Sequence, residues 1–346
     1  MPQIEPNRFK MRSATNRSAF PNYNALGVFL IFLSIFNHIH AAEIPTVTRL
    51  GDGPIITQNM DGRMGGNVQG PSLIKVPKWV KNPLGKYYLY FADHRGTYIR
   101  LAYADDLSGP WSMHEHGSLP LEDSHFPTSV PKELQDLPYA YAHIASPDVH
   151  VREDLKEIVM YLHGWDIRNG SGTQFTRLAT SDDGIHFEGH PEVLGRSYFR
   201  VTKHRDYYYA LAMPGYLYRS KDGIGEFEPG PRFFNDNMRH NALLVRDNIL
   251  YVFWTQAGDA PERIFVSTID MKGDWSTWYA SGPIEVLRPE HKWEGADLEI
   301  KPSERGYIGV PANQLRDPAI FEEDGETFLL YSVAGESGIA IAKLNF

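Results

Sequence analysis

The sequence predicts an all-β fold, a five-bladed β-propeller, on the basis of three observations. Aromatic residues make up 13% of the 346 residues and accompany 30 Gly and 24 Pro, a composition typical of short strands joined by tight turns. A unit of short strands recurs five times, at a period of about 40 to 50 residues that is typical of propeller blades. No stretch has a convincing helical periodicity.

Composition and charge exclude several classes of function. Lys and Arg number 34 against 43 Asp and Glu, so the net charge is −9, which argues against a nucleic-acid partner because such proteins present a basic face. The chain has no cysteine, which excludes disulfides, thiolate catalysis and cysteine-bearing zinc sites. With 42% hydrophobic and 22% charged residues, the composition is that of a globular protein.

The first 42 residues have the pattern of a signal peptide. A basic segment is followed by the apolar run Ala25–Phe36 and then by Ala41 and Ala42, in the order of a secretory signal. A run of about twelve residues is too short to cross a bilayer as a helix, so an uncleaved anchor is the less favoured alternative. We expect export to the periplasm or the extracellular space, no stable membrane insertion after cleavage, and one propeller domain over residues 43–346.

Each blade begins with an apolar strand, a turn and a Tyr-rich strand. The second half of a blade is a strand that ends in a small acidic turn and an aromatic residue, seen at Trp111, Phe187, Phe227 and Trp275. The longest spacing predicts an inserted loop at His114–Tyr141. The first halves are GPSLIKV with KYYLYFA, SPDVHV with EIVMYLHGW, YFRVTKHRD with YYYALAM, RHNALLVRDN with ILYVFWT, and RDPAIFEEDGE with TFLLYSVAG.

The two ends of the domain are expected to pair. Thr46–Leu50 has no blade of its own, and Gly338–Leu344 ends the chain as an apolar strand. Pairing the N-terminal strand with the C-terminal one would close the ring and remove two open sheet edges.

Three short motifs resemble those of a known group of enzymes. GPSLI with GKYYLYFA, ASPDV, and RDPAIF with GETFLLYS resemble the five-bladed β-propeller glycoside hydrolases of the arabinanase and β-xylosidase types and, more remotely, the neoagarooligosaccharide hydrolases. The resemblance implies an exported hydrolase of oligosaccharides from plant or algal polysaccharide. It also implies that the first residues of the innermost strands converge on the axis, where a base, an orienting carboxylate and a general acid act.

The resemblance assigns catalytic roles to two aspartates. Asp148, in Ser-Pro-Asp-Val, matches the orienting carboxylate, and Asp317, in Arg-Asp-Pro, lies at the equivalent strand start of the last blade as base or stabiliser. Gln69 is a departure, because it stands where the similar enzymes place a glutamic acid as proton donor and an amide cannot donate that proton.

The residues themselves supply further candidates for the acid and the base. Asp93 and His94 open a turn dense in functional groups, and a neighbouring carboxylate favours a protonated histidine. His240 begins the innermost strand of the fourth blade. We expect Asp317 or Asp93 to activate water while His94, His240 or Glu299 protonates the leaving oxygen, the two groups facing each other across the glycosidic bond.

The predicted substrate contacts come from strand starts, turns and exposed aromatic residues. The arginines among them suit an acidic or sulfated sugar, and the tryptophan offers a face on which a sugar ring stacks. The predicted binding residues are Gln69, Arg95, Trp165, Arg200, Arg239, Asn241 and Glu299.

No cofactor is required by this interpretation and no metal-binding residues are assigned, although the axis of a propeller has room for a structural divalent ion. The main alternative is a non-catalytic propeller that binds carbohydrate or protein through a degenerate site, which the Gln69 departure favours. A metal-dependent lactonase-type propeller is the third possibility; it requires a cage of oxygen ligands on the axis.

Overall fold

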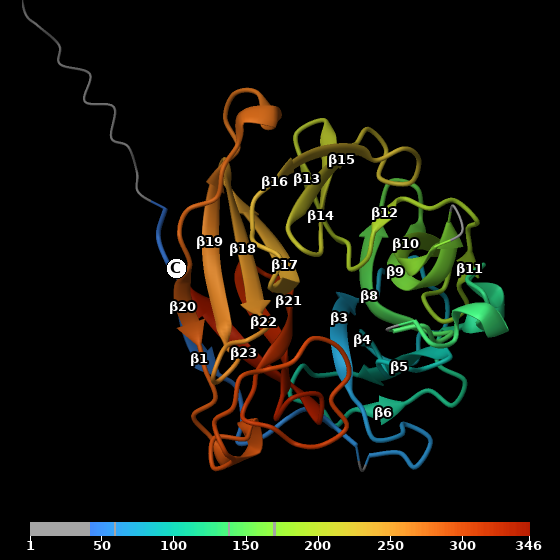
Figure 1. Cartoon of the computed structure of the whole chain (residues 1–346), viewed down its shortest axis with the longest axis horizontal. Coiled ribbons are helices and arrows are strands. Elements are labelled where there is room, and N and C mark those ends of the chain that lie inside the picture. Colours follow the sequence, from blue (N-terminus) through green and yellow to red (C-terminus); the bar gives the residue numbers. More distant parts are fainter. Residues whose placement is uncertain (1–41, 59, 138, 169–170) are drawn as a thin grey trace, which may run out of the picture. The chain divides into compact units, whose positions relative to one another are not determined.

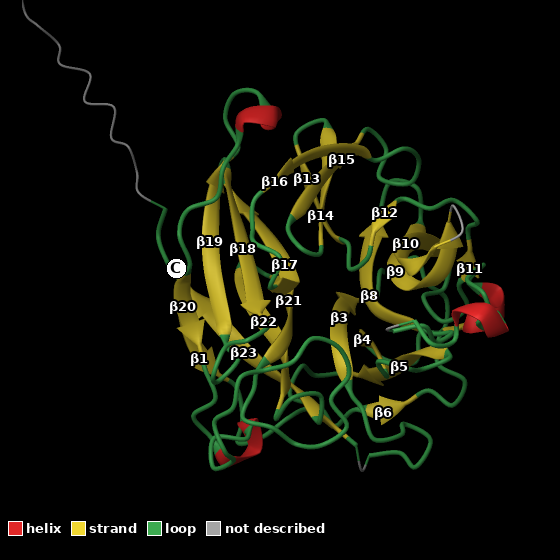
Figure 2. Ribbon diagram, viewed as in Figure 1, coloured by secondary structure: helices red, strands yellow, loops and turns green. Residues whose placement is uncertain are grey.

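The computed structural model describes residues 42–58, 60–137, 139–168 and 171–346, and within them the prediction of a five-bladed propeller is confirmed. Five antiparallel sheets are arranged around a common axis (Figures 1 and 2). Residues Ala42–Phe346 form one compact unit. The prediction of a signal peptide at 1–42 lies, except for Ala42, outside the described residues and stays a prediction. None of the described helices is long and apolar enough to span a bilayer.

Each sheet is a blade of four strands that runs outward from the axis. The innermost strands are β3 (Gln69–Lys75), β8 (Ile144–Arg152), β13 (Arg200–His204), β17 (Met238–Arg246) and β21 (Arg316–Glu323). The second strands are β4 (Tyr87–Ala92), β9 (Glu157–Arg168), β14 (Tyr207–Ala212), β18 (Ile249–Gln256) and β22 (Glu326–Val333). All ten fall on the strand pairs that the sequence predicts.

The outer half of each blade contains the edge strands. The third strands are β5 (Tyr98–Ala104), β10 (Ser171–Ser181), β15 (Tyr216–Ser220), β19 (Ile264–Asp270) and β23 (Gly338–Asn345). The fourth are β6 (Ser112–Met113), β11 (Glu188–Gly189), β16 (Glu228–Arg232), β20 (Ile284–Leu287) and β1 (Thr46–Arg49). The short strands β2 (Ile56–Thr57), β7 (Leu119–Pro120) and β12 (Gly195–Arg196) add to β23, β5 and β10.

Hydrophobic packing joins neighbouring blades through five clusters, each of which lies between two adjacent sheets. A blade in a propeller is covered on both faces, which is why its inner strands read as nearly continuous apolar runs rather than as alternating ones. The recurring aromatics lie at these junctions: Tyr90 meets Phe187 edge-on at 5.8 Å and Tyr161 meets Phe227 at 6.2 Å. The aromatic content noted in the sequence therefore holds the blades together.

The predicted closure of the ring is confirmed. Strand β1 pairs antiparallel with β23, so the last blade takes its outer strand from the beginning of the domain. A partly buried ion pair adds to this junction, since Arg49 donates to Glu294 from Nε at 2.8 Å and from Nη2 at 3.0 Å. Glu294 is fully buried in the helical turn η4 (Lys292–Glu294) and also accepts a hydrogen bond from Tyr331.

Arg49→Ala is expected to lower the free energy of unfolding by about 2 kcal/mol, because the charge of Glu294 stays buried without its cationic partner. Urea unfolding followed by tryptophan fluorescence measures this effect. Lys343→Ala is the matched control, since Lys343 lies on the paired strand and forms only an exposed ion pair with Glu326, which contributes at most about 1 kcal/mol. Equal effects of the two substitutions would contradict the role of Arg49 in closure.

The 3-10 turns lie in the loops between strands. The predicted insertion after β6 contains β7 and the 3-10 turns η1 (Leu121–Asp123) and η2 (Lys132–Leu134). A second long loop, which the sequence analysis does not anticipate, connects β20 to β21 and contains η4. The turn η3 (Trp275–Thr277) lies between β19 and β20.

Candidate active site

One residue near the start of each innermost strand has a left-handed backbone. These five residues are Gly70 (φ 66°), Ser146 (φ 49°), Tyr198 (φ 66°), His240 (φ 43°) and Asp317 (φ 48°). In four blades this residue lies within a register irregularity of the ladder. The left-handed conformation is unfavourable for residues other than glycine and tends to occur where function requires a particular side-chain direction. The ring therefore marks the axial end of the propeller as the functional end.

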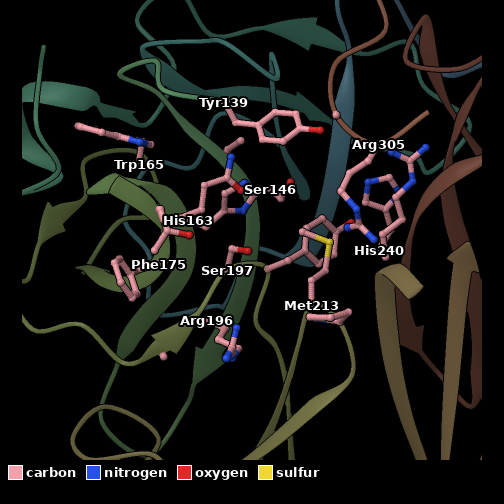
Figure 3. A pocket seen from close by; sticks show the side chains of 18 of the residues that line it. Tyr139, Ser146, His163, Trp165, Phe175, Arg196, Ser197, Met213, His240 and Arg305 are labelled. Carbon is pink, nitrogen blue, oxygen red and sulfur yellow. The ribbon is translucent and has the colours of Figure 1, made fainter. Parts of the chain in front are cut away.

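A pocket of about 630 Å³ opens at this axial end, and Ser146, Tyr198 and His240 of the ring line it. Trp165 and Phe175, from the long β9–β10 hairpin, lie on the side opposite to His240 and Arg305 (Figure 3). The rings of Tyr198 and His240 lie 5.3 Å apart. The volume and the mixture of aromatic walls and polar groups suit a small organic ligand.

Asp317 lies against the rings that line the pocket and is itself buried. Its Oδ1 accepts a hydrogen bond from the Tyr198 hydroxyl at 2.8 Å and lies 3.5 Å from Nε2 of His240. Its Oδ2 has no hydrogen-bond partner among the described residues. Burial, with the nearby charge of Glu336, raises the pKa of Asp317 to about 6. A carboxyl group in this state changes its protonation near neutral pH, as an acid or base catalyst must.

His94 also lines the pocket, and a buried carboxylate lies behind it. Its Nδ1 is 3.3 Å from Oε1 of Glu336, which also accepts a hydrogen bond from Arg316 at 2.7 Å. Burial alone would raise the pKa of Glu336, but the interactions with His94, Arg316 and Asn67 lower it to about 2. Glu336 is therefore ionised and orients the imidazole through Nδ1, which leaves Nε2 for proton transfer.

A second buried carboxylate supports the fourth and fifth blades. Glu262 accepts hydrogen bonds from Arg239 through two oxygens and lies 3.3 Å from Nε of Arg316. Burial opposes ionisation of Glu262, but the two guanidinium groups lower its pKa. Burial, with the positive charges of Arg239 and Arg316, lowers the pKa of His240 well below its ordinary value, so this ring is neutral.

Asp148 does not line the pocket. Its carboxylate accepts the backbone N–H of Val201 in the next blade at 2.7 Å and lies 2.8 Å from Nε2 of His150 and 3.4 Å from Nη1 of Arg200. Burial opposes ionisation, but His150 and Arg200 lower the pKa of Asp148. Asp148, two positions after the left-handed Ser146, thus faces the junction of blades two and three, where it connects the two sheets.

Asp148→Asn is expected to lower the free energy of unfolding by about 1–3 kcal/mol, because buried Arg200 loses its counter-charge. Ligand affinity should change less than threefold, since the side chain is outside the pocket. Thermal unfolding and ligand titration of the same preparation check both parts. The interpretation fails if binding is lost while stability is unchanged.

The other predicted residues separate into two groups. Gln69, His94, Trp165, Arg239 and His240 line the pocket.

The second group of predicted residues does not line the pocket. Asp93 caps its own turn by accepting the N–H of Arg95. Arg200 is buried beneath Tyr198, and Asn241 donates to the carbonyl of Leu211. Glu299, predicted as a proton donor or substrate contact, does not line the pocket; it is exposed and pairs with Lys301. Arg95 lies outside the pocket, against the rings of Tyr141 and Tyr307.

Several residues of the site escaped the sequence analysis. Tyr198 stands in a strand motif that was recognised, but nothing distinguishes it from the many packing aromatics. Glu336 and Glu262 lie in loops that join the second and third strands of their blades, more than 15 residues from the arginines they contact. No group of three or more histidine, aspartate or glutamate side chains in the described ranges is arranged to hold a metal ion.

Comparison with known sequences identifies a relative of the whole domain. No protein-family model matches the chain. The sequence is 36% identical over 353 residues to the uncharacterized protein R118 of Acanthamoeba polyphaga mimivirus, with 92% of this chain and 96% of that protein covered.

Solved structures share the propeller fold at low sequence identity. An exo-1,5-α-L-arabinanase from a bovine ruminal metagenomic library is 14% identical, with a TM-score of 0.51 over 81% of this chain and 94% of its own. A β-xylosidase/α-arabinofuranosidase from a compost metagenome is 14% identical (TM-score 0.52; 87% and 94% covered). An N-acetylgalactosamine deacetylase from F. plautii is 13% identical (TM-score 0.53; 86% and 95% covered). The chain thus has the fold of these glycoside hydrolases, and the third structure shows that the same fold also occurs in an enzyme of a different kind.

Proposed function

We propose that this chain, which belongs to one family with the mimivirus protein R118, is a glycoside hydrolase that cleaves oligosaccharides in its axial pocket. The propeller enzymes with which it shares its fold all carry names that refer to carbohydrates. A shared fold does not decide the reaction, so the proposal rests on the chemistry of the site.

The observation that carries the proposal is the state of Asp317. It is the single carboxylate among the five ring residues, and its pKa is raised to about 6 by burial and the charge of Glu336. Tyr198 occupies one of its oxygens, whereas the other has no partner among the described residues. A buried carboxylate with one uncommitted oxygen requires a functional explanation, and a general base supplies one.

In the proposed reaction, Oδ2 of Asp317 takes a proton from a water molecule, and the oxygen of that water attacks the anomeric carbon. The bond from that carbon to the glycosidic oxygen breaks, and protonated His94 donates its Nε2 proton to the leaving oxygen. The ionised Asp317 also stabilises the positive charge that develops on the sugar ring. His94 thus takes the place of the acid that Gln69 does not supply.

The test is incubation of the purified protein with plant and algal oligosaccharides, with products detected by mass spectrometry, in parallel with Asp317→Asn and Asp324→Asn. Asp324 is an exposed turn residue of the same blade, so its substitution removes a carboxylate of equal charge away from the site. Cleavage by the native protein and by Asp324→Asn, with loss in Asp317→Asn, supports the proposal. Cleavage that survives in Asp317→Asn overturns the mechanism.

One observation favours a second candidate, a carbohydrate-binding protein without catalysis. Among the described residues, no aspartate or glutamate lines the axial pocket, whereas two carboxylates usually flank the scissile bond in glycosidases. Binding of an oligosaccharide without release of products, unchanged in Asp317→Asn, would establish this second function.

A further inference from the structure

We infer that the ligand of the axial pocket is an anionic oligosaccharide, whose carboxylate or sulfate groups are bound by Arg168, Arg196 and Arg305. The inference deepens the proposed function and rests on it only for the assumption that the ligand is a carbohydrate. All three arginines line the pocket, and they come from β9, β12 and the β20–β21 loop.

The three arginines differ from the other arginines of the site in their partners. Arg200 and Arg239 are buried and paired with Asp148 and Glu262. In contrast, the guanidinium of Arg168 lies over the ring of Phe175 and that of Arg196 over the ring of Tyr216. Arg305 donates to the backbone carbonyl of Asp236. Within the part of the chain that the structure describes, none of these three forms an ion pair, so their charges are available to a ligand.

The carboxylates around the pocket lie behind the residues that line it. Glu336 and Glu262 are paired with arginines, and Asp317 lies against Tyr198 and His240. The described residues that line the pocket include no carboxylate. Burial lowers the pKa of His163 and His240, with further lowering by nearby positive groups, so both rings are neutral. Burial and the neighbouring Arg239 also lower the pKa of Arg305, but a guanidinium group keeps its positive charge at neutral pH. In a protein with 43 acidic and 34 basic residues, a positive pocket without carboxylates favours an anion, and guanidinium groups bind carboxylate and sulfate oxygens well.

A neighbouring hollow extends this surface outward. It measures about 600 Å³ and shares Tyr139 and Arg305 with the axial pocket. Arg95 completes it, held between the rings of Tyr141 and Tyr307. No acidic side chain of the described residues lines this hollow. Aromatic rings alternate with guanidinium groups along both cavities, which suits a chain of several sugar rings with repeated negative charges. Of the arginines that the sequence suggests for an acidic or sulfated sugar, Arg95 and Arg239 border these cavities.

The experiment is calorimetric titration with matched pairs of oligosaccharides in low salt. One pair is trigalacturonic acid and its carboxyl-reduced form, and the other is a sulfated carrageenan tetrasaccharide and its desulfated form. The two pairs distinguish carboxylate from sulfate as the recognised group. Arg196→Gln and Arg305→Gln are compared with Arg205→Gln, which removes the same charge at an exposed site where Arg205 contacts Asn248. Hydrolysis of each sugar is measured in parallel.

We expect an anionic member to bind at least about tenfold more tightly than its neutral partner, with a preference that weakens at high salt. Each pocket substitution should weaken that binding about tenfold, the usual effect of losing a charge-assisted hydrogen bond, whereas Arg205→Gln should not. Equal or tighter binding of the neutral members overturns the inference, as does an absence of binding by both anionic members. Hydrolysis of neutral sugars alone would leave the proposed function in place while refuting this inference. Binding of an anionic sugar without hydrolysis would refute the proposed function and leave this inference in place.

Discussion

Asp317→Asn is expected to reduce kcat/KM for any oligosaccharide that the protein hydrolyses by about 10²–10⁴-fold, the usual contribution of a general base. The amide keeps the shape of the side chain and can still accept the hydrogen bond of Tyr198, but it cannot take a proton from water. Because the pKa of Asp317 is raised to about 6, the activity of the native protein should rise as the pH increases through about 6. Steady-state kinetics between pH 4 and 9 measure both effects.

Stability measurements on the same variant separate loss of catalysis from loss of folding. A carboxyl group whose pKa is about 6 in the folded chain, against an ordinary 3.8, binds its proton more tightly when folded. As the pH rises from about 4 to about 6, the folded state therefore loses stability relative to the unfolded state, by up to roughly 3 kcal/mol. Asn has no proton to lose, so Asp317→Asn should be more stable than the native protein at pH 8 and similar to it at pH 4. An inactive variant that is also unfolded would not support a catalytic role.

Glu262→Gln is expected to lower the free energy of unfolding by about 3–5 kcal/mol, the largest effect on stability that we predict. Glu262 is fully buried between Arg239 and Arg316, and its removal leaves the charge of Arg239 buried without a carboxylate. Breaking a buried ion pair by removing one partner costs this much because the other charge stays away from water. Urea unfolding at pH 7 measures the change.

The pH dependence and a matched variant make this prediction specific. The pKa of Glu262 is lowered in the folded state by Arg239 and Arg316 against the opposing effect of burial, so its stabilising contribution is present above the ordinary pKa of 4.5 and is lost as the pH falls. The difference between Glu262→Gln and the native protein should accordingly shrink at acidic pH. Glu285→Gln, in an exposed pair with Arg288, should cost less than about 1 kcal/mol. A comparable cost for both variants would show that the buried network is not important for stability.

The fold was largely predictable because the information that specifies it is local. Each blade repeats the same sequence of apolar strand, tight turn and aromatic residue, and a blade cannot bury both of its faces unless it packs between two others. Pairing of Thr46–Arg49 with the last strand follows from the same argument, since it fills the open edge of the fifth blade. Motif resemblance and strand position also identified Asp317, His94 and His240 as candidates.

The roles of individual side chains were decided by the tertiary structure. Asp148 and Asp317 stand in similar motifs, but Asp317 takes the left-handed position at the axis, whereas Asp148 comes two residues after it and faces the next blade. Sequence alone does not show which way a side chain points at a register irregularity.

What the sequence by itself determined is the architecture and the position of the axial end, because periodicity and turn chemistry act over a few residues. What only the tertiary structure decided is the environment of each charge. Glu336 and Glu262 reach the site from loops, and ion pairs with buried carboxylates separate Arg200 and Arg239 from the arginines available to a ligand. Burial, counter-charges and the pKa of Asp317 depend on contacts between residues distant in the chain, and those contacts exist only once the blades have packed around the axis.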